Sequence, residues 1–391
     1  MIDYNKILPE KIVSIPKSGI RKYFDMITPD MKDVISLTVG QPDFVTPWHI
    51  REAGIQSLET GKTFYTANAG LMELRCEIDK YMTRRFSLSY DPSSEIIVTV
   101  GGSEAIDIAM RAILDIGDEV IIPTPSFVCY EPLTRMAGAV PVILETYMED
   151  EFRIDPAKLK ALITPKTKMI VLPFPNNPTG AIMTRAELME IADIIKDTNI
   201  IVLSDEIYAE MTYGDRHVSI ASIEGMKERT IVVNGFSKAF AMTGWRLGWV
   251  CAPAPITAQM LKIHQYEIMS SPTTSQFAAI SALKNGDPDI EYMTAEYDRR
   301  RTLIYNRLNE MGLECFEPKG AFYVFPKISQ FGISGEEFCS ELLKRYHVAI
   351  VPGEAFGACG LGYARISYAY SINHIVEGLD RMEKFINEIK K

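Results

Sequence analysis

Lys238 is the residue of this chain best suited to covalent chemistry. It lies in the segment 234–248, which follows a β-branched run typical of a strand, and its neighbours are small or apolar. A lysine in such a loop is partly desolvated, which disfavours its ammonium form and leaves a nucleophilic amine near neutral pH. The loop is therefore compatible with Schiff-base chemistry. Taken alone, a lysine between Ser and Ala is better interpreted as a surface residue.

Residues near Lys238 add an anion site to this amine. Ser237 places a hydroxyl beside the lysine, and Arg246 places a guanidinium eight residues later. The Gly-rich turn 101–104 opens an expected helix, whose N-terminus offers N–H groups and the positive end of a dipole. Because that end stabilises an anion by only ~0.3–1 kcal/mol, a tightly held phosphate also needs the charge-assisted bonds of an arginine. Together these features indicate an aldehyde cofactor that carries a phosphate.

Two further loops offer groups for the ring of such a cofactor. Asp205 follows the expected strand 200–204, and its carboxylate can pair with a ring nitrogen and keep it protonated, as the electron sink of pyridoxal phosphate requires. An Asp here could also be a helix N-cap, and the two roles are compatible. Asn177, in the segment 175–180, offers a donor fixed by the proline that follows it.

The order of strand-like and helical patterns explains how these loops come together. Short β-branched runs alternate with longer helical patterns through the middle of the chain, which is the signature of parallel βαβ units. In open α/β sheets, ligands gather at the carboxyl ends of the strands, where these polar loops lie. We expect strands over 95–100, 119–122, 168–172, 200–204 and 230–233, and helices over 103–114, 130–137 and 185–195.

From about residue 287 the pattern changes to that of a separate α+β domain. Its first expected helix contains the charged run 298–301, which is interpreted as a solvated helix face. We expect helices over 290–311 and 373–389, and strand-like segments over 320–326 and 364–371.

Composition and charge exclude several classes of protein. The chain has 391 residues, 47% of them hydrophobic and 24% charged, which is typical of a globular protein of two to three domains and excludes a disordered chain. The formal net charge is -10, and basic residues are interleaved with acids rather than clustered. A nucleic-acid surface is therefore not expected.

Hydropathy and cysteine spacing predict neither a membrane span nor a metal site. No apolar run approaches the ~18–20 residues that a span needs, and charges stand where a signal peptide would carry its apolar region. We therefore expect a cytoplasmic protein. The six cysteines form no C-x-x-C pair and have no zinc-finger spacing with histidine, so they are interpreted as reduced thiols.

Four motifs in a fixed order, GGSEA, PNNPTG, SDEIY and NGFSKAFAMTGWRLG, carry a family resemblance. With them the chain resembles the class I aminotransferases of the fold-type I pyridoxal-phosphate enzymes over nearly its whole length. SGIRKYFDM, MKDVISL, NEMGL and PKGAFYVFP resemble the branch that includes archaeal aromatic aminotransferases. The resemblance implies pyridoxal 5'-phosphate as the cofactor and an α/β fold. A large cofactor-binding domain (45–285) would surround a mainly parallel seven-stranded sheet, and a smaller, discontinuous α+β domain would comprise 1–44 and 286–391.

The resemblance also implies roles for the residues around the cofactor ring. Lys238 would form the internal aldimine and, once freed by the substrate, shuttle a proton between the substrate α-carbon and the cofactor C4′. Asp205 would pair the pyridinium nitrogen, and Tyr208 and Asn177 would hydrogen-bond the phenolic oxygen. Phe127 would stack on the ring, whereas outside the family pattern it would be an ordinary core aromatic.

Further residues would hold the anionic groups. Arg365 would grip the substrate α-carboxylate, assisted by Gly40 and Asn177; outside the family pattern it would be a surface ion pair. Tyr65 matches a tyrosine that reaches the neighbouring subunit's phosphate site, which predicts a homodimer with shared active sites, but alone it would be a core aromatic. Gly235 replaces a hydroxyl found in many relatives, so one phosphate bond would be missing or replaced. The phosphate would be held by Gly102, Ser103, Glu104, Ser237 and Arg246, although Glu104 could favour the first helical turn and contribute only its backbone.

The implied function is amino transfer in ping-pong half-reactions. The donor would be an L-amino acid, with aromatic donors preferred and broad specificity, and the acceptor a 2-oxo acid such as 2-oxoglutarate. One branch of aspartate aminotransferases clamps a second carboxylate with an arginine from the segment matching 264–281, which contains no Arg or Lys here. Other branches place that cation elsewhere, so an aspartate or other class I aminotransferase stays open. A carbon–sulfur lyase and a non-catalytic regulatory protein on this scaffold are the remaining alternatives.

Overall fold

A seven-stranded sheet forms the centre of the molecule. The computed structural model describes residues 2–25, 31 and 33–390. Within them the strand order is β2-β8-β7-β6-β5-β3-β4, and β8 runs antiparallel to both neighbours while the other pairs are parallel. The predicted mainly parallel sheet is confirmed. Its strands are β2 (Ile96–Thr99), β3 (Glu119–Thr124), β4 (Val140–Glu145), β5 (Thr167–Leu172), β6 (Ile201–Asp205), β7 (Thr230–Gly235) and β8 (Gly248–Cys251).

Two of these strands, β4 and β8, were not predicted. β4 is an edge strand with only one buried residue and a proline at position 141, so it lacks the buried β-branched run that marks the other strands. β8 is buried but only four residues long, and it begins with Gly248 at the end of the Lys238 motif. The five predicted strands lie within two residues of their expected ends.

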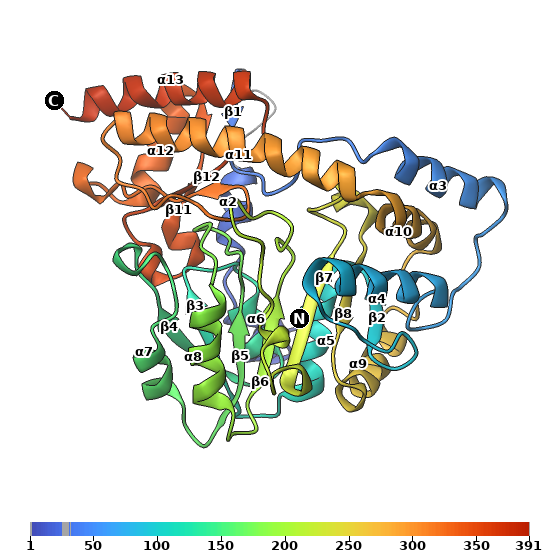
Figure 1. Cartoon of the computed structure of the whole chain (residues 1–391). Helices are drawn as coiled ribbons and strands as arrows, with labels where there is room; N and C mark the ends of the chain where they lie inside the picture. The colour runs from blue at the N-terminus through green and yellow to red at the C-terminus, as the bar shows by residue number, and fades with distance from the viewer. Residues whose placement is uncertain (1, 26–30, 32, 391) are drawn as a thin grey trace.

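Helices cover both faces of the sheet (Figure 1). On one face, α5 and α9 pack against the apolar cluster that contains Ile122; on the other, α7 and α8 cover the cluster that contains Ile121. The two neighbouring isoleucines enter different clusters because successive side chains of a strand point to opposite faces. α4 and α10 complete the second face beside β2 and β8. The helices are α3 (Trp48–Glu59), α4 (Met72–Phe86), α5 (Gly101–Ile113), α6 (Tyr130–Met136), α7 (Pro156–Leu162), α8 (Arg185–Ile195), α9 (Ala254–Glu267) and α10 (Thr273–Asn285).

The C-terminal elements lie together beside the large sheet, drawn orange and red in Figure 1. β1 (Ile35–Ser36) pairs in parallel with β10 (Val348–Ala349), so a segment near the N-terminus joins them. Residues 26–30 and 32 of the predicted segment 1–44 lie outside the described residues, and the division at 44 and 286 stays a prediction. No helix in the described ranges is long and apolar enough to cross a membrane. The other elements are α1 (Glu10–Val13), α2 (Gly19–Asp25), α11 (Asp287–Glu310), α12 (Gly335–Tyr346), α13 (Ile372–Ile389), β9 (Tyr323–Val324), β11 (Val351–Pro352) and β12 (Ala364–Ser367).

The charged run 298–301 does not form one solvated face, which corrects the prediction from sequence. The side chain of Arg299 is 75% exposed, but that of Arg300 is only 7% exposed and donates to Asp43 at 2.7 Å. Arg301 is also largely buried and pairs with Glu317 at 2.6 Å. Consecutive residues of an α-helix point about 100° apart, so three in a row cannot share a face.

Candidate active site

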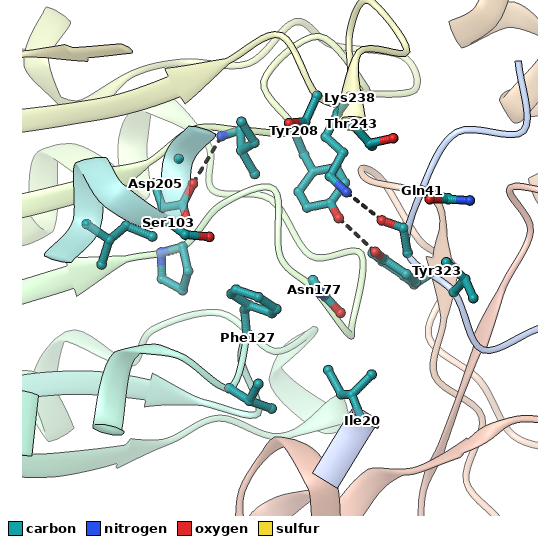
Figure 2. Close-up of a pocket in the computed structure, with 18 of the residues that line it drawn as sticks. Ile20, Gln41, Ser103, Phe127, Asn177, Asp205, Tyr208, Lys238, Thr243 and Tyr323 are labelled. Carbon is teal, nitrogen blue, oxygen red and sulfur yellow. Dashed lines mark hydrogen bonds between the residues drawn. The ribbon is translucent and has the colours of Figure 1, made fainter. Parts of the chain in front are cut away.

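The predicted site residues surround a cavity of about 560 Å³ at the carboxyl ends of the central strands (Figure 2). Asp205 is the last residue of β6, Asn177 follows β5, Lys238 follows β7 and Phe127 follows β3. On the opposite side the lining comes from residues 38–41, Tyr323 and Arg365. The cavity therefore lies where strand ends of the large sheet meet the segments that include β9 and β12.

Lys238 places its amine inside this cavity. Its Nζ donates to the carbonyl oxygen of Gly40 at 2.5 Å and lies 5.4 Å from the ring centroid of Tyr208. Burial, followed by the positive charges of Arg365 and Arg246, lowers the pKa of Lys238 to about 7. A large fraction of the amine is therefore neutral near neutral pH, as a nucleophile requires.

Asp205 is a buried carboxylate held by two donors. Its Oδ2 accepts from the hydroxyl of Tyr130 at 2.7 Å, and its Oδ1 accepts from the backbone N–H of Ile207 at 3.2 Å. Burial raises the pKa of Asp205, and the two hydrogen bonds oppose that rise. Tyr130 was not among the predicted site residues, because nothing in its local sequence distinguishes it from a core aromatic of α6.

Tyr208 forms a hydroxyl pair with Tyr323, a second residue that sequence reasoning missed. The two hydroxyl oxygens lie 2.7 Å apart, and Arg365 stacks over the Tyr323 ring at 4.6 Å from its centroid. The Tyr323 hydroxyl also occupies the space that a side chain at position 40 would need, so Gly40 is required there. In the sequence, Tyr323 is marked only by its place in the strand-like segment 320–326 and in the family resemblance of 318–326, and neither indicates a contact with Tyr208.

Arg365, on β12, is 1% exposed and lines the cavity. Its Nη1 donates to Oδ1 of Asn177 at 3.0 Å, and its Nη2 donates to the carbonyl oxygen of Thr38. Nε is buried without a hydrogen-bond partner in the described part of the chain. Since its partners are neutral, the guanidinium keeps its charge for an anion in the cavity.

The turn at the start of α5 meets a second arginine. Gly102, Ser103, Ser237 and Arg246 all line the cavity. Gly101 has a φ of +77°, and a Cβ there would lie 2.8 Å from Nη2 of Arg246, so only glycine fits between the turn and the guanidinium. The first N–H groups of a helix have no partner within it, and here they adjoin a fixed positive charge.

The cavity carries an excess of positive charge. Lys238, Arg246 and Arg365 line it together with one carboxylate, Asp205, and none of the three cations forms an ion pair with a described residue. This balance suits a ligand with two anionic groups. Across the described residues, no group of three or more His, Cys, Asp or Glu side chains could hold a metal ion.

Two predicted residues lie outside this cavity. Glu104 is not part of the lining; its carboxylate accepts from the backbone N–H of Val100 and lies 2.5 Å from Nδ1 of His264. Tyr65 is 81% exposed on the segment between α3 and α4. The predicted contact of Tyr65 with a neighbouring subunit stays a prediction.

The sequence and the structure of this chain are similar to those of known aminotransferases. Residues 32–381 match the family described as Aminotransferase class I and II. The chain is 47% identical to the aspartate aminotransferase of Pyrococcus abyssi, over 98% of this chain and 99% of that protein. It is 43% identical to aromatic-amino-acid aminotransferase 2 of Thermococcus litoralis, again over 98% and 99%. The crystal structure of an aromatic aminotransferase from Pyrococcus horikoshii OT3 superposes with a TM-score of 0.90 at 46% identity, covering 95% of this chain and 99% of that one.

Proposed function

The chain belongs to the class I and II aminotransferases, which makes it a pyridoxal-phosphate-dependent enzyme of fold-type I, and we propose that it prefers aromatic L-amino acids as donors. In this proposal the amino group passes to a 2-oxo acid such as 2-oxoglutarate in two ping-pong half-reactions. The cofactor, when bound, supplies an aldehyde for the amino group and a protonated ring that accepts electron density from the substrate α-carbon. The observation that carries the assignment of amino transfer is the buried amine of Lys238 among two arginines and one carboxylate.

The ring side of the cavity has a partner for each polar atom of the cofactor. We assign Asp205 to the pyridine nitrogen, because a buried carboxylate with a raised pKa is stabilised by a cationic neighbour. Tyr208 and Asn177 would hydrogen-bond the phenolic oxygen, and Phe127 would cover one face of the ring. Lys238 would hold the cofactor through its amine and, once released, would move a proton between the substrate α-carbon and C4′.

The two anionic groups are assigned to the two ends of the cavity. At the α5 end, N–H groups of the first turn and Arg246, a charge-assisted partner, would hold the phosphate. At the other end, Arg365 would bind the substrate α-carboxylate, with Gly40 and Asn177 beside it. The phosphate residues would be Gly102, Ser103, the backbone of Glu104, Ser237 and Arg246, joined by Tyr65 of a second subunit.

Replacement of the reactive amine tests the assignment directly. We expect Lys238→Ala to abolish turnover while the protein still binds the cofactor without a covalent bond, followed by the absorbance of the bound cofactor. Lys284→Ala is the matched control, because Lys284 pairs with Glu73 on the surface. Normal transamination by Lys238→Ala would overturn the proposed function.

The aromatic preference rests on what lines the substrate side. Ile20, Val39, Gln41 and Tyr323 line the cavity near Arg365, and the described lining has no cation besides the three already assigned. The same chain is 47% identical to an aspartate aminotransferase, so a dicarboxylate donor is the rival. A panel of phenylalanine, tyrosine, aspartate and cystathionine with 2-oxoglutarate separates the two and also detects pyruvate from a carbon–sulfur lyase.

Exposed apolar side chains support a homodimer. Trp48, Phe64, Tyr65 and Tyr266 are each more than half exposed, and large exposed apolar side chains that gather in a patch mark a protein–protein interface. We propose that this surface binds a second copy and brings Tyr65 to the partner's phosphate. A strictly monomeric active enzyme in light scattering would contradict it. The cytoplasmic location and the division into domains 45–285 and 1–44 with 286–391 remain predictions.

A further inference from the structure

His264 is a completely buried histidine below the phosphate end of the cavity. It lies on α9 with 0% exposure, and both of its ring nitrogens have close partners. Nδ1 lies 2.5 Å from Oε1 of Glu104, and Nε2 lies 2.8 Å from the carbonyl oxygen of Asn68. The ring thereby connects the first turn of α5 with the segment that carries Tyr65.

The partners of His264 determine where its protons lie. A carbonyl oxygen only accepts, so Nε2 must donate to Asn68. At Nδ1 the ring faces a carboxylate oxygen, and an ionised carboxylate only accepts, so Nδ1 must donate as well. The other carboxylate oxygen of Glu104 accepts from the N–H of Val100, which suits the ionised form. The other charged groups here are engaged: Glu267 of α9 and Asp107 of α5 both pair with Arg111.

We propose that His264 is an imidazolium that serves as the counter-ion of Glu104, and so keeps the α5 N-terminus attractive to the phosphate of the cofactor. The proposal rests on the proposed function. The carboxylate of Glu104 lies in the first helical turn, next to Ser103, where an unpaired negative charge would repel a phosphate. Paired with His264, it adds no net charge. His264 touches neither cofactor nor substrate and is a positioning residue.

The same histidine helps to fix the segment that leads to Tyr65. Besides the bond from His264, the side chain of Asn68 donates to the carbonyl oxygen of Met269 at 2.7 Å. Thr273 donates to the carbonyl oxygen of Phe64, also at 2.7 Å. The α9–α10 corner therefore holds both ends of this segment, and His264 is its connection to α5.

A second histidine shows that two partners alone do not require a cation. Nδ1 of His49 lies 2.8 Å from the Ser281 hydroxyl, and Nε2 lies 3.0 Å from Asp289. The Ser281 hydroxyl also lies 3.1 Å from the carbonyl oxygen of His49, and when its one proton points to Nδ1 instead, a neutral ring protonated at Nε2 satisfies both ring contacts. His49 is thus the matched control within the same chain.

The protonation state is tested by nitrogen NMR of the holoenzyme with ¹⁵N-labelled histidine. We expect the His264 ring to show two protonated nitrogens at pH 7.5. This signal should be absent in His264→Gln and should lose its imidazolium signature in Glu104→Gln. His49→Gln should leave that signal in place. A neutral ring protonated only at Nε2 in the wild-type protein would overturn the proposal, because the proton would then belong to Glu104.

The effect on the cofactor is tested by a double-mutant cycle. His264→Gln leaves Glu104 unpaired, so the dissociation constant of pyridoxal phosphate from the apoenzyme should rise by at least about tenfold. The double variant with Glu104→Gln should recover most of that loss, whereas His49→Gln should change nothing. A double variant as weak as His264→Gln, with an unchanged thermal midpoint, would overturn the proposal. Wild-type turnover of the donor panel tests the proposed function separately, so either can fail alone.

Discussion

The two sides of the cavity are assembled in different ways. Asp205, Lys238 and Arg246 come from one stretch of the chain and lie at adjacent strand ends of a single sheet. Thr38 and Arg365, on the substrate side, come from opposite ends of the chain and meet through Nη2 of the arginine. The cofactor side is therefore positioned by local chain order and a rigid sheet, whereas the substrate side depends on contacts between distant segments. Changes far from the cavity should reach the substrate side more easily.

The segment from Gly40 to Thr46 shows how that dependence arises. The Thr46 hydroxyl donates to the carbonyl oxygen of Ala241 at 2.6 Å, which ties the segment to the loop of Lys238. Asp43, in its middle, accepts from Arg300 of α11 at 2.7 Å. The carbonyl of Gly40 that receives the lysine amine is thus positioned by contacts with two separate elements.

The largest difference between the two sides of the cavity is expected when Arg365 is replaced. Two charge-assisted hydrogen bonds to a carboxylate are worth ~1.5–3 kcal/mol each, so Arg365→Gln should lower kcat/KM for amino-acid donors by about a hundredfold or more. Cofactor absorbance should be retained, because the cofactor side is built separately. Arg299→Gln, on an exposed position, is the control. Loss of cofactor binding together with turnover would show that the two sides are not independent.

On the cofactor side, the rate of cofactor uptake should depend on pH through Lys238. The pKa of Lys238 is lowered to about 7 by burial and then by Arg365 and Arg246, so its nucleophilic form is half populated there. Below that pH, the rate at which the apoenzyme takes up pyridoxal phosphate should fall about tenfold per unit; above it, the rate should level off. Stopped-flow absorbance across a pH range of about two units on either side of that pKa measures this. Arg365→Gln removes one positive charge and should move the break to higher pH, whereas a rate that still rises at the upper end would contradict the prediction.

An intermediate effect is expected at Arg300, outside the cavity. Arg300→Met keeps packing against Phe44 but leaves Asp43 without its partner, which should cost about 1–3 kcal/mol of stability and loosen the segment 40–46. We expect the KM for the donor to rise by about tenfold, which is about 1.4 kcal/mol and lies within that range, with little change in cofactor affinity. Arg299→Met is the matched control on the same helix. If the two variants had the same thermal midpoint and the same KM, the prediction that Arg300 positions the substrate side would be wrong.

Residues on the cofactor side could be predicted from the sequence more easily than contacts between distant segments. Lys238, Asp205 and Arg246 were found because each lies in a short motif after a strand, where local order determines position. Tyr323 was missed because its role depends on contact with Tyr208, 115 residues away. The burial of Arg300 was missed for the same reason, since its partner Asp43 is 257 residues away and a charge run alone indicates exposure.

The smallest effect, and the most specific one, is expected from Tyr323→Phe. The change removes only the hydroxyl that pairs with Tyr208, and a single hydrogen bond of this kind is worth about 0.5–1.5 kcal/mol, so kcat/KM should fall by about threefold. Because Tyr208 is assigned to the phenolic oxygen, the pH midpoint of the visible absorbance of the bound cofactor should also shift. Tyr368→Phe loses a hydroxyl that bonds the carbonyl oxygen of Ala321 at 3.2 Å outside the cavity lining, and should leave that midpoint unchanged. A shift in both variants, or in neither, would mean that the Tyr208–Tyr323 pair does not connect the two sides of the cavity.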